Sequence, residues 1–294
     1  MAVSEYFSKL YRRLPVIREM KATFRLLEEI QADLRRISAK ELVELLEFTV
    51  PRTSRYGDPK RLMLYAQQTF SQHGEDGMIA EIFRRIDAPL RTFLEIGTGD
   101  GLQNNTTALL DCGWRGWWID GDPNNVRAIL ATFREPISTA RLSVLQALVT
   151  AENIVSLLDR LAVPKEIDLL SLDIDRNTYW VWKAMSTVCR PRAVVIEYNS
   201  SLPADVDWKV EYRPDANWNR SAYFGASLKA LELLGREHGY SLVGCDFTGV
   251  NAFFVRSDLC GDKFAEPFTA ENHYEPPRYG LSARSGHPAA FRDG

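Results

Sequence analysis

From about residue 66 onward, short apolar runs alternate with segments whose apolar residues recur every three or four positions. The runs have the length of single strands, and the segments between them have the periodicity of helices. We expect strands at 92–96, 116–119, 142–146, 167–172 and 193–196. We expect helices at 78–86 and near 102–112, 124–134, 151–161 and 177–188. Such alternation predicts βαβ units and therefore a parallel sheet.

The pattern changes after residue 199. A long polar insertion spans 199–221, and a helical segment at 222–238 then ends at Gly239, a residue that commonly follows helices. Two apolar runs, 240–247 and 251–256, come next and are separated by three residues that include Gly249. Such a connection is typical of a β-hairpin, so the last strand should run antiparallel to the others.

The N-terminal segment has a purely helical pattern. One helix face is predicted by the spacing of Ile17, Met20, Phe24, Leu27, Ile30, Leu34 and Ile37. Ser38 and Glu41 form a capping-box pattern that predicts a second helix. This region could pack on the main body, join two copies in a homo-oligomer or cover the substrate as a lid. We therefore divide the chain into a helical region at 1–62, an α/β domain at 63–260 and an irregular tail at 261–294.

Composition narrows the class of protein. The 294 residues are 45% apolar and 26% charged, as in an average soluble protein. Residues 1–62 carry 13 Lys and Arg against 9 Asp and Glu, whereas the remainder carries 23 against 30. The net charge of −3 argues against a nucleic-acid partner held by bulk electrostatics.

The expected location follows from what the sequence lacks. The N-terminus has no signal-peptide pattern, and no apolar run approaches the roughly 18 residues of a membrane span. The four cysteines have no zinc-ligand spacing and suit a reducing compartment. We therefore expect a cytoplasmic protein that is not integral to a membrane.

The strongest local motif follows the run at 92–96. It reads Glu95-Ile-Gly97-Thr-Gly99-Asp-Gly101 and precedes a helical segment. Glycines let the backbone approach a ligand closely, while a helix N-terminus points its amides at the ligand. The spacing differs from the Gly-x-Gly-x-x-Gly of dinucleotide-binding folds, and the preceding acid suits a cationic cofactor. An ordinary tight strand–helix turn is the alternative.

Polar residues also end the next two predicted strands. Asp120 could accept hydrogen bonds from both hydroxyls of a ribose, whereas Asp122 is better placed to cap the following helix. Gln146 and Ala147 end the third strand and would lie beside an adenine ring in a nucleoside-binding α/β fold. This last assignment rests on topology alone.

The fourth and fifth predicted strands end in oxygen-bearing side chains. Asp173 and Asp175 follow one strand, and Glu197 and Asn199 follow the other. The carboxyl ends of neighbouring parallel strands meet at one edge, where ligands bind. Carboxylate and amide oxygens suit Mg²⁺, which could lower the pKa of an acceptor hydroxyl. Helix caps and polar strand ends without a metal are the alternative.

Two further features bear on a substrate. His73 lies in the polar stretch at 71–77 and is a candidate general base, although it could equally be a surface histidine. His238 lies at a helix C-terminus, where a structural role is expected. The insertion at 199–221 mixes Trp208 and Trp218 with charged residues, which would suit a polyhydroxylated acceptor such as a sugar.

Taken in order, these motifs resemble the S-adenosylmethionine-dependent methyltransferases with a Rossmann-like fold. More narrowly, they resemble the FkbM-type and related sugar or natural-product O-methyltransferases. The matching stretches lie at 71–77, 95–101, 113–120, 168–175, 194–199, 225–230 and 249–255. The resemblance implies an α/β fold with a seven-strand, mostly parallel sheet and an antiparallel last strand. It covers about 66–260 and leaves the helical region 1–62 out.

The resemblance also implies roles for individual residues. Glu95, Gly97 and Gly99 would hold the methionine part of S-adenosylmethionine, and Asp120 the ribose. The predicted cofactor site also includes Gln72, Gly101, Gln146 and Ala147. In metal-dependent relatives the ligands come from the positions of Asp173, Glu197 and Asn199. Relatives often have Gly-Asn-Asp where this chain has Arg176-Asn177-Thr178, which removes a carboxylate and adds a cation.

The sequence therefore predicts transfer of a methyl group to a hydroxyl of a saccharide or a glycosylated metabolite. A metal at Asp173, Glu197 and Asn199 would promote loss of the acceptor's proton, or a base such as His73 or Asp173 would accept it. Two rivals remain. A nicotinamide-dependent oxidoreductase would share the fold, but the glycine spacing disfavours it. A non-catalytic scaffold that binds cofactor or a partner is disfavoured by the intact polar strand ends.

Overall fold

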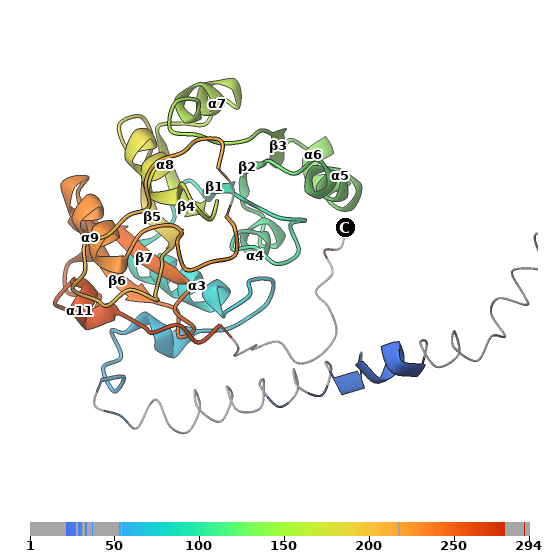
Figure 1. The fold of residues 1–294 in the computed structure, drawn as a ribbon. Coiled ribbons are helices and arrows are strands. Elements are labelled where there is room, and N and C mark those ends of the chain that lie inside the picture. The colour runs from blue at the N-terminus through green and yellow to red at the C-terminus, as the bar shows by residue number, and fades with distance from the viewer. Residues whose placement is uncertain are drawn as a thin grey trace, which may run out of the picture.

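The computed structural model describes residues 22–27, 29, 30, 33, 37, 53, 55–216, 218–279 and 291. A seven-strand sheet forms its centre, in the order β3-β2-β1-β4-β5-β7-β6 (Figure 1). The strands are β1 (Thr92–Ile96), β2 (Arg115–Asp120), β3 (Leu142–Gln146), β4 (Glu166–Leu172), β5 (Arg190–Glu197), β6 (Tyr240–Cys245) and β7 (Asn251–Arg256).

The direction of the strands confirms the predicted fold class. Strands β1 to β5 pair in parallel, whereas β7 pairs antiparallel with both β5 and β6. The chain builds outward from β1 through β2 to β3, and then crosses back to place β4 on the other side of β1. This reversal opens a crevice at the carboxyl ends of β1 and β4, which is where open α/β sheets bind ligands.

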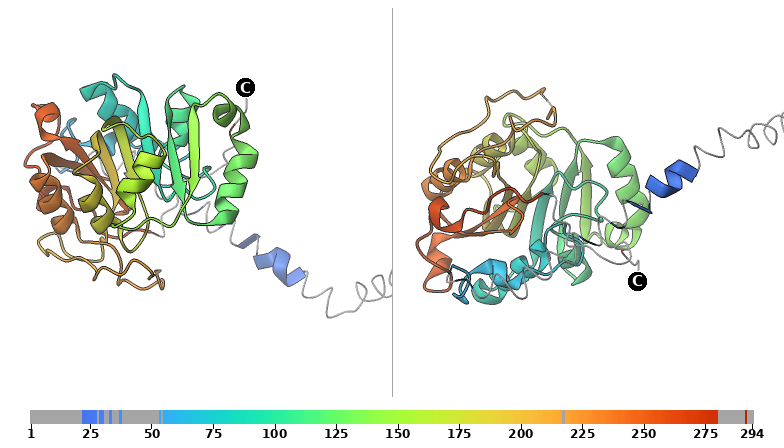
Figure 2. Two further views of the ribbon diagram at one scale, coloured as in Figure 1. Left: turned by 90° about the horizontal axis from the view of Figure 1, so that it is seen from above. Right: turned by 60° about the horizontal axis from the view of Figure 1, so that its bottom comes forward.

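Helices cover both faces of the sheet (Figure 2). Buried side chains of α7, α8 and α9 pack on one face, and those of α3, α4 and α5 pack on the other. The helices are η3 (a 3₁₀ helix, Leu62–Tyr65), α3 (Glu75–Ile86), α4 (Thr107–Asp111), α5 (Pro123–Thr132), α6 (Arg134–Ser138), α7 (Ile154–Arg160), α8 (Thr178–Met185), α9 (Leu228–Glu237), α10 (Ser257–Cys260) and α11 (Ala270–His273). None of the helices described is long and apolar enough to span a lipid bilayer.

Two predicted helices begin later than expected. Helix α9 begins at Leu228 and not at residue 222, because Ser227 caps it by accepting a hydrogen bond from the Ala230 amide. The backbone before it is held open by Asn199, whose amide group donates to the carbonyls of Ala222 and Phe224. The helix predicted near 102–112 is reduced to α4, because tertiary hydrogen bonds engage residues 104–106.

The segments on either side of the sheet domain differ in how far they are buried. The described residues of the N-terminal segment at 22–37 are helical, and Phe24, Leu27, Ile30 and Ile37 are exposed there. The helix predicted after Ser38 lies outside the described residues. Toward the C-terminus, residues 261–279 pack on the body and bury the side chains of Phe264, Ala265, Ala270 and His273. The division of the chain into three regions remains a prediction.

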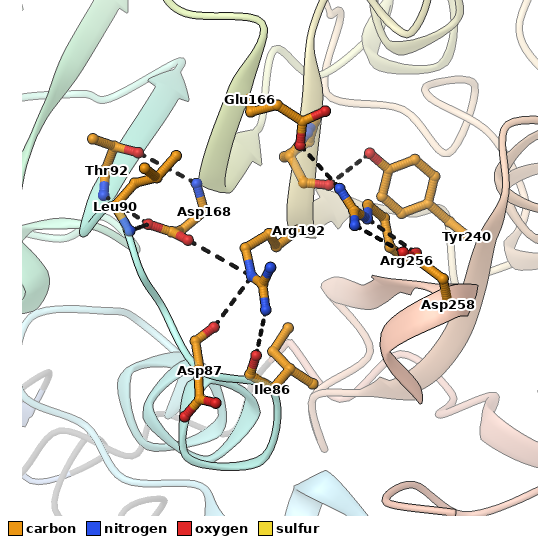
Figure 3. A network of polar contacts seen from close by, with 11 residues as sticks. Ile86, Asp87, Leu90, Thr92, Glu166, Asp168, Arg192, Tyr240, Arg256 and Asp258 are labelled. Carbon is orange, nitrogen blue, oxygen red and sulfur yellow. Dashed lines mark hydrogen bonds and ion pairs between the residues drawn. The ribbon is translucent and has the colours of Figure 1, made fainter. Parts of the chain in front are cut away.

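A network of polar contacts joins α3 to the amino ends of the strands, at the opposite end of the sheet from the crevice (Figure 3). The buried Asp168 carboxylate accepts hydrogen bonds from the amides of Leu90 and Thr92. Arg192 lies 3.7 Å from this carboxylate and donates to the carbonyls of Ile86 and Asp87. The network fixes the end of α3, and α3 in turn carries the polar stretch that borders the crevice.

Candidate functional site

The first glycine of the motif lets β1 and β4 meet at the crevice. A Cβ atom on Gly97 would lie 1.6 Å from the carbonyl oxygen of Asp173, and the residue has a φ of +83°. The Gly97 amide donates to Ile119 on β2, while the Asp173 amide donates to Ile96 on β1. Only glycine fits between the three strand ends, so the crevice depends on this residue.

The other two glycines serve different purposes. A Cβ on Gly99 would meet no atom within 4 Å, so this residue faces open space at the crevice. Its amide donates a hydrogen bond of 2.8 Å to Asp120 at the end of β2. A Cβ on Gly101 would lie 2.7 Å from Phe133 and 2.9 Å from Trp118. Gly101 is therefore required by core packing, although the sequence placed it with the cofactor.

Glu95 organises the loop that follows the glycines. Its buried carboxylate accepts hydrogen bonds from Asn104 Nδ2 at 2.8 Å, the Asn105 amide at 2.9 Å, Ser171 Oγ at 3.0 Å and the Thr106 hydroxyl. Burial raises the pKa of Glu95 to about 7, although these hydrogen bonds oppose the shift. Glu95 therefore ties the loop to β4 and is one of the residues that line the crevice.

Two adjoining cavities occupy the crevice. The larger, of about 570 Å³, is lined by the glycine loop and by residues from the stretch before α3 and from β7, among them Gln72, His73, Glu75, Glu95, Gly97, Gly99, Asp120, Asp173 and Asn251. The smaller, of about 330 Å³, is lined by residues that include Ile119, Gly121, Ala147, Val149, Asn177 and Trp218. Gly97, Leu148, Ile174 and Asp175 line both. Both volumes are in the range of small-molecule sites.

Most of the predicted cofactor residues meet at these cavities. Gln72, Glu95, Gly97, Gly99 and Asp120 line the larger one, and Ala147 lines the smaller. Gln146 pairs with Asp120 across β3 and β2, but its side chain is exposed and it lines neither of the two cavities. Gly101 also lines neither. Asp122 caps α5 by accepting a hydrogen bond from the Asn124 amide, the capping role expected from the sequence.

Three carboxylates gather where β4 and β5 end. Oxygen atoms of Asp173, Asp175 and Glu197 all lie within 4.8 Å of one another. Desolvation within the crevice, followed by the charge of Asp175, raises the pKa of Asp173 to about 6, although part of this residue is exposed. Burial and the charges of both aspartates raise the pKa of Glu197 well above its usual range. One oxygen of Glu197 is buried without a hydrogen-bond partner. The cluster therefore favours a bound proton or a bound cation.

Asn199 occupies a different place from the one expected. Its Nδ2 group donates to the carbonyls of Ala222 and Phe224, at 2.8 and 3.0 Å. Its Oδ1 atom accepts a hydrogen bond from the Ser201 amide. Both ends of the side chain thus hold the backbone of the insertion, and the carboxylate that joins Asp173 and Glu197 in the cluster is Asp175.

His73 lies at the wall of the larger cavity, next to two acids. Its backbone amide donates a hydrogen bond of 2.7 Å to Glu75, and its imidazole Nδ1 is buried without a partner. The histidine is close enough to lower the pKa of both Glu75 and Asp173, although burial raises both overall. The structure thus brings the two residues that were predicted to act on a proton, His73 and Asp173, to one cavity.

The insertion at 199–221, which the sequence assigned to acceptor binding, forms a roof over the smaller cavity. The hydrogen bonds that tether it include those from Trp180 Nε1 to the Val210 carbonyl at 2.9 Å, from Asn177 Nδ2 to the Arg213 carbonyl at 2.9 Å, and from the Ala151 amide to the Tyr212 hydroxyl at 3.0 Å. Figure 1 shows this segment crossing the ends of the strands. Pro214, Ala216, Trp218 and Arg220 thereby line the smaller cavity. The aromatic content of the insertion was the available signal, but it did not reveal which cavity is covered.

Comparison with known proteins gives weak similarities. No family model matches the sequence, and no curated protein is significantly similar. Among solved structures, the N-terminal domain of EvdMO1, determined with SAH and D-fucose, is 14% identical with a TM-score of 0.40, over 62% of this chain and 80% of that one. The methyltransferase domain of bacterial CtHen1-C is 14% identical with a TM-score of 0.37, over 62% of this chain and 97% of that one. An O-methyltransferase family protein from Burkholderia thailandensis is 11% identical with a TM-score of 0.36, over 62% of this chain and 57% of that one.

Proposed function

We propose that the protein is an S-adenosylmethionine-dependent O-methyltransferase. The observation that carries the proposal is the pair of adjoining cavities at the carboxyl ends of β1 to β4. Asp120, the acid suited to a ribose, ends β2 and lines the larger cavity, and its neighbours Ile119 and Gly121 line the smaller one. A nucleoside joined to an amino acid has this two-lobed shape, with the ribose at the centre.

Each lobe has the chemistry that one end of the cofactor needs. The smaller cavity has apolar walls at Ile119, Ala147 and Val149 and an aromatic roof at Trp218, which suits a purine ring. The larger cavity gathers six carboxyl groups, from Glu75, Glu95, Asp100, Asp120, Asp173 and Asp175. Such a concentration of acids favours a cationic ligand with an ammonium and a sulfonium group.

When bound, S-adenosylmethionine supplies a methyl group on a positively charged sulfur. The cavity contributes by holding an acceptor hydroxyl in line with that methyl, which can account for several kcal/mol of the barrier. Asp173 and His73 are placed to accept the proton that the acceptor loses. With a pKa of about 6, Asp173 is a stronger base near neutral pH than an ordinary aspartate.

As the alternative to Asp173 acting as the base, we propose that Asp173, Asp175 and Glu197 hold Mg²⁺. Their oxygens lie within 4.8 Å of one another, and the buried, unpartnered oxygen of Glu197 adds a ligand atom in need of a partner. A hard divalent cation suits this donor set and would lower the pKa of a bound hydroxyl. Titration with MgCl₂ should raise the melting temperature of the wild-type protein and not that of Glu197→Gln. Turnover that is unchanged after exhaustive chelation would remove the metal from the mechanism.

We propose a saccharide as the acceptor because of the aromatic side chains beside the crevice. The rings of Trp208 and Tyr223 lie 5.5 Å apart, and the Arg176 guanidinium lies 5.3 Å from the centre of the Tyr223 ring. Tyr223 is about half exposed, so a ring face is available to a polyhydroxylated ligand. Transfer of labelled methyl groups to a panel of sugars would test this assignment.

Calorimetric titration with S-adenosylhomocysteine tests the proposed function. We expect one binding site in the wild-type protein and at least tenfold weaker binding in Asp120→Ala. Asp122→Ala is the matched control, because this carboxylate caps α5 and does not line the cavities. It should cost about 1 kcal/mol of stability and leave affinity unchanged. Tight binding of NADH with no response to S-adenosylhomocysteine would instead support an oxidoreductase.

Two properties of the whole chain remain proposals. The exposed apolar residues Phe24, Leu27, Ile30 and Ile37 could join two copies of the chain, which sedimentation of a Phe24→Asp variant would test. We also propose that the protein is cytoplasmic, a location that four free cysteines would suit.

A further inference from the structure

Glu75 is a buried acid in the wall of the larger cavity that holds neither the cofactor nor a metal in the proposed mechanism. The residue is 1% exposed, and its carboxyl accepts hydrogen bonds from Asn251 Nδ2 at 2.8 Å and from the His73 amide at 2.7 Å. Both partners line the same cavity. Burial, followed by the charge of Asp246, raises the pKa of Glu75. An acid at this position therefore lowers the stability of the folded protein at neutral pH.

The local structure does not require an acid at position 75. A glutamine could accept the hydrogen bond of the His73 amide with its carbonyl oxygen. Its amide group could donate to Asn251 Oδ1 once the Asn251 side-chain amide has turned by 180°. The residues described as lining the larger cavity include no lysine or arginine, so no such side chain pairs with the Glu75 charge there. A buried carboxylate without a cation is costly, so a cationic group on a ligand would fit this position.

The order of the strands places Glu75 on the acceptor side of the reacting centre. Strands β2, β1, β4, β5 and β7 follow one another across the sheet, so Asp120, Asp173 and Asn251 follow one another along its carboxyl edge. Asn251 lies two strand spacings, roughly 10 Å, beyond Asp173. The proposed function places the ribose at Asp120 and the transferred methyl group at Asp173. A group bound by Glu75, the partner of Asn251, therefore belongs to the acceptor and lies on the side away from the ribose.

We propose that Glu75 binds an amino group of the acceptor and makes the enzyme selective for amino sugars among saccharides. The inference rests on the proposed function, which places a saccharide beyond the transferred methyl group. An ammonium group donates a hydrogen bond to the carboxylate and supplies the missing cation, whereas a hydroxyl supplies the hydrogen bond alone. The ammonium nitrogen has no lone pair, so it is held and not methylated, and the methyl group still goes to a hydroxyl oxygen. A carboxylate or phosphate in its place would be repelled by Glu75.

Rates of methyl transfer to paired acceptors test the proposal. The probes are the methyl glycosides of glucose, galactose and mannose, each compared with the analogues in which one hydroxyl is replaced by an amino group and with the N-acetyl forms of those analogues. At least one amino analogue should have a kcat/KM about tenfold or more above that of its parent, because a charge-assisted hydrogen bond replaces a neutral one. Its N-acetyl form, which carries no charge, should lose this advantage. Parent glycosides that are methylated as well as every amino analogue would overturn the inference.

Glu75→Gln separates recognition of the acceptor from a structural role. The variant should lose the preference for the amino analogue, keep its affinity for S-adenosylhomocysteine within twofold, and be at least as stable as the wild type in urea at pH 8. A purely structural role predicts a loss of stability with the preference intact, and that result would also overturn the inference. Glu81→Gln is the matched control, because Glu81 is a buried acid on the same helix that does not line the cavity. It should keep the preference.

The same measurements distinguish failure of the inference from failure of the proposed function. If the wild-type protein does not bind S-adenosylhomocysteine, the proposed function fails together with the inference. If it binds S-adenosylhomocysteine but methylates no member of the panel, the saccharide assignment and the inference fail, and the cofactor site stands. If it methylates the parent glycosides without preferring an amino analogue, the inference fails alone.

Discussion

The buried Glu95 carboxyl should make the free energy of unfolding of the wild-type protein fall as the pH rises. Replacing Glu95 by glutamine should abolish this dependence on pH. Burial raises the pKa of this carboxyl from 4.5 to about 7 in the folded protein. The folded state therefore holds the proton more tightly than the unfolded state. The resulting contribution to stability is complete below about pH 4.5 and is lost as the pH rises through about 7.

The size of the effect follows from the shift. A difference of about 2.5 pKa units corresponds to about 3 kcal/mol of unfolding free energy in the wild-type protein. Glutamine does not titrate, but its amide must face a donor that cannot reverse, either Asn104 Nδ2 or the Asn105 amide. This mismatch costs about 2 kcal/mol at every pH. The variant should thus be about 1 kcal/mol less stable than the wild type at pH 5 and about 1 kcal/mol more stable than it at pH 8.

Urea unfolding at pH 5 and pH 8, followed by tryptophan fluorescence, measures the free energy of unfolding of the wild-type protein and of the variant. Glu81→Gln is the control, because hydrogen bonds from Arg84 hold the pKa of Glu81 below its usual value, and this carboxylate stays ionised at both pH values. Its effect on stability should be the same at pH 5 and pH 8. If Glu95→Gln and the wild-type protein show the same dependence of stability on pH, the reasoning about the buried carboxyl is refuted.

Three further predictions concern the strand ends. Gly97→Ala should prevent folding, because its Cβ would lie 1.6 Å from the Asp173 carbonyl oxygen. Gly99→Ala should instead lower the free energy of thermal unfolding by about 1 kcal/mol and weaken binding of S-adenosylhomocysteine at least tenfold. Asp173→Asn should lower kcat about a hundredfold or more with affinity for S-adenosylhomocysteine nearly unchanged, and the wild-type rate should fall as the pH drops through about 6. Arg192→Met should lower the unfolding free energy by about 3 kcal/mol in urea, because it leaves the buried Asp168 charge without its cation (Figure 3).

The elements that the sequence predicted best are those decided by local pattern. The apolar runs at 92–96 and 142–146 coincide with β1 and β3, because each run is bounded by polar or turn-forming residues. The starts of α4 and α9 were wrong because Glu95 and Asn199 bind the backbone ahead of each helix. Contacts between residues so far apart in sequence leave no trace in local periodicity.

In the candidate site, too, local rules predicted some residues, whereas contacts between distant parts of the chain decided others. The rule that ligands gather at strand ends placed Asp120, Asp173 and Glu197 correctly at the carboxyl edge of the sheet. It could not choose between Asp175 and Asn199, because that choice depends on which side chain the insertion engages. The tether from Asn177 to the insertion was also hidden, because its hydrogen bond to the Arg213 carbonyl exists only once the insertion has folded over α8.

A crystal structure of the complex with S-adenosylhomocysteine tests the central claim most directly. The account predicts the adenine in the smaller cavity, beside Ala147 and under Trp218, with the ribose hydroxyls on Asp120. The amino-acid end should extend into the larger cavity toward Gly99, with its sulfur facing Asp173. A ligand bound outside these two cavities, or in them with adenine and amino acid exchanged, would contradict the account.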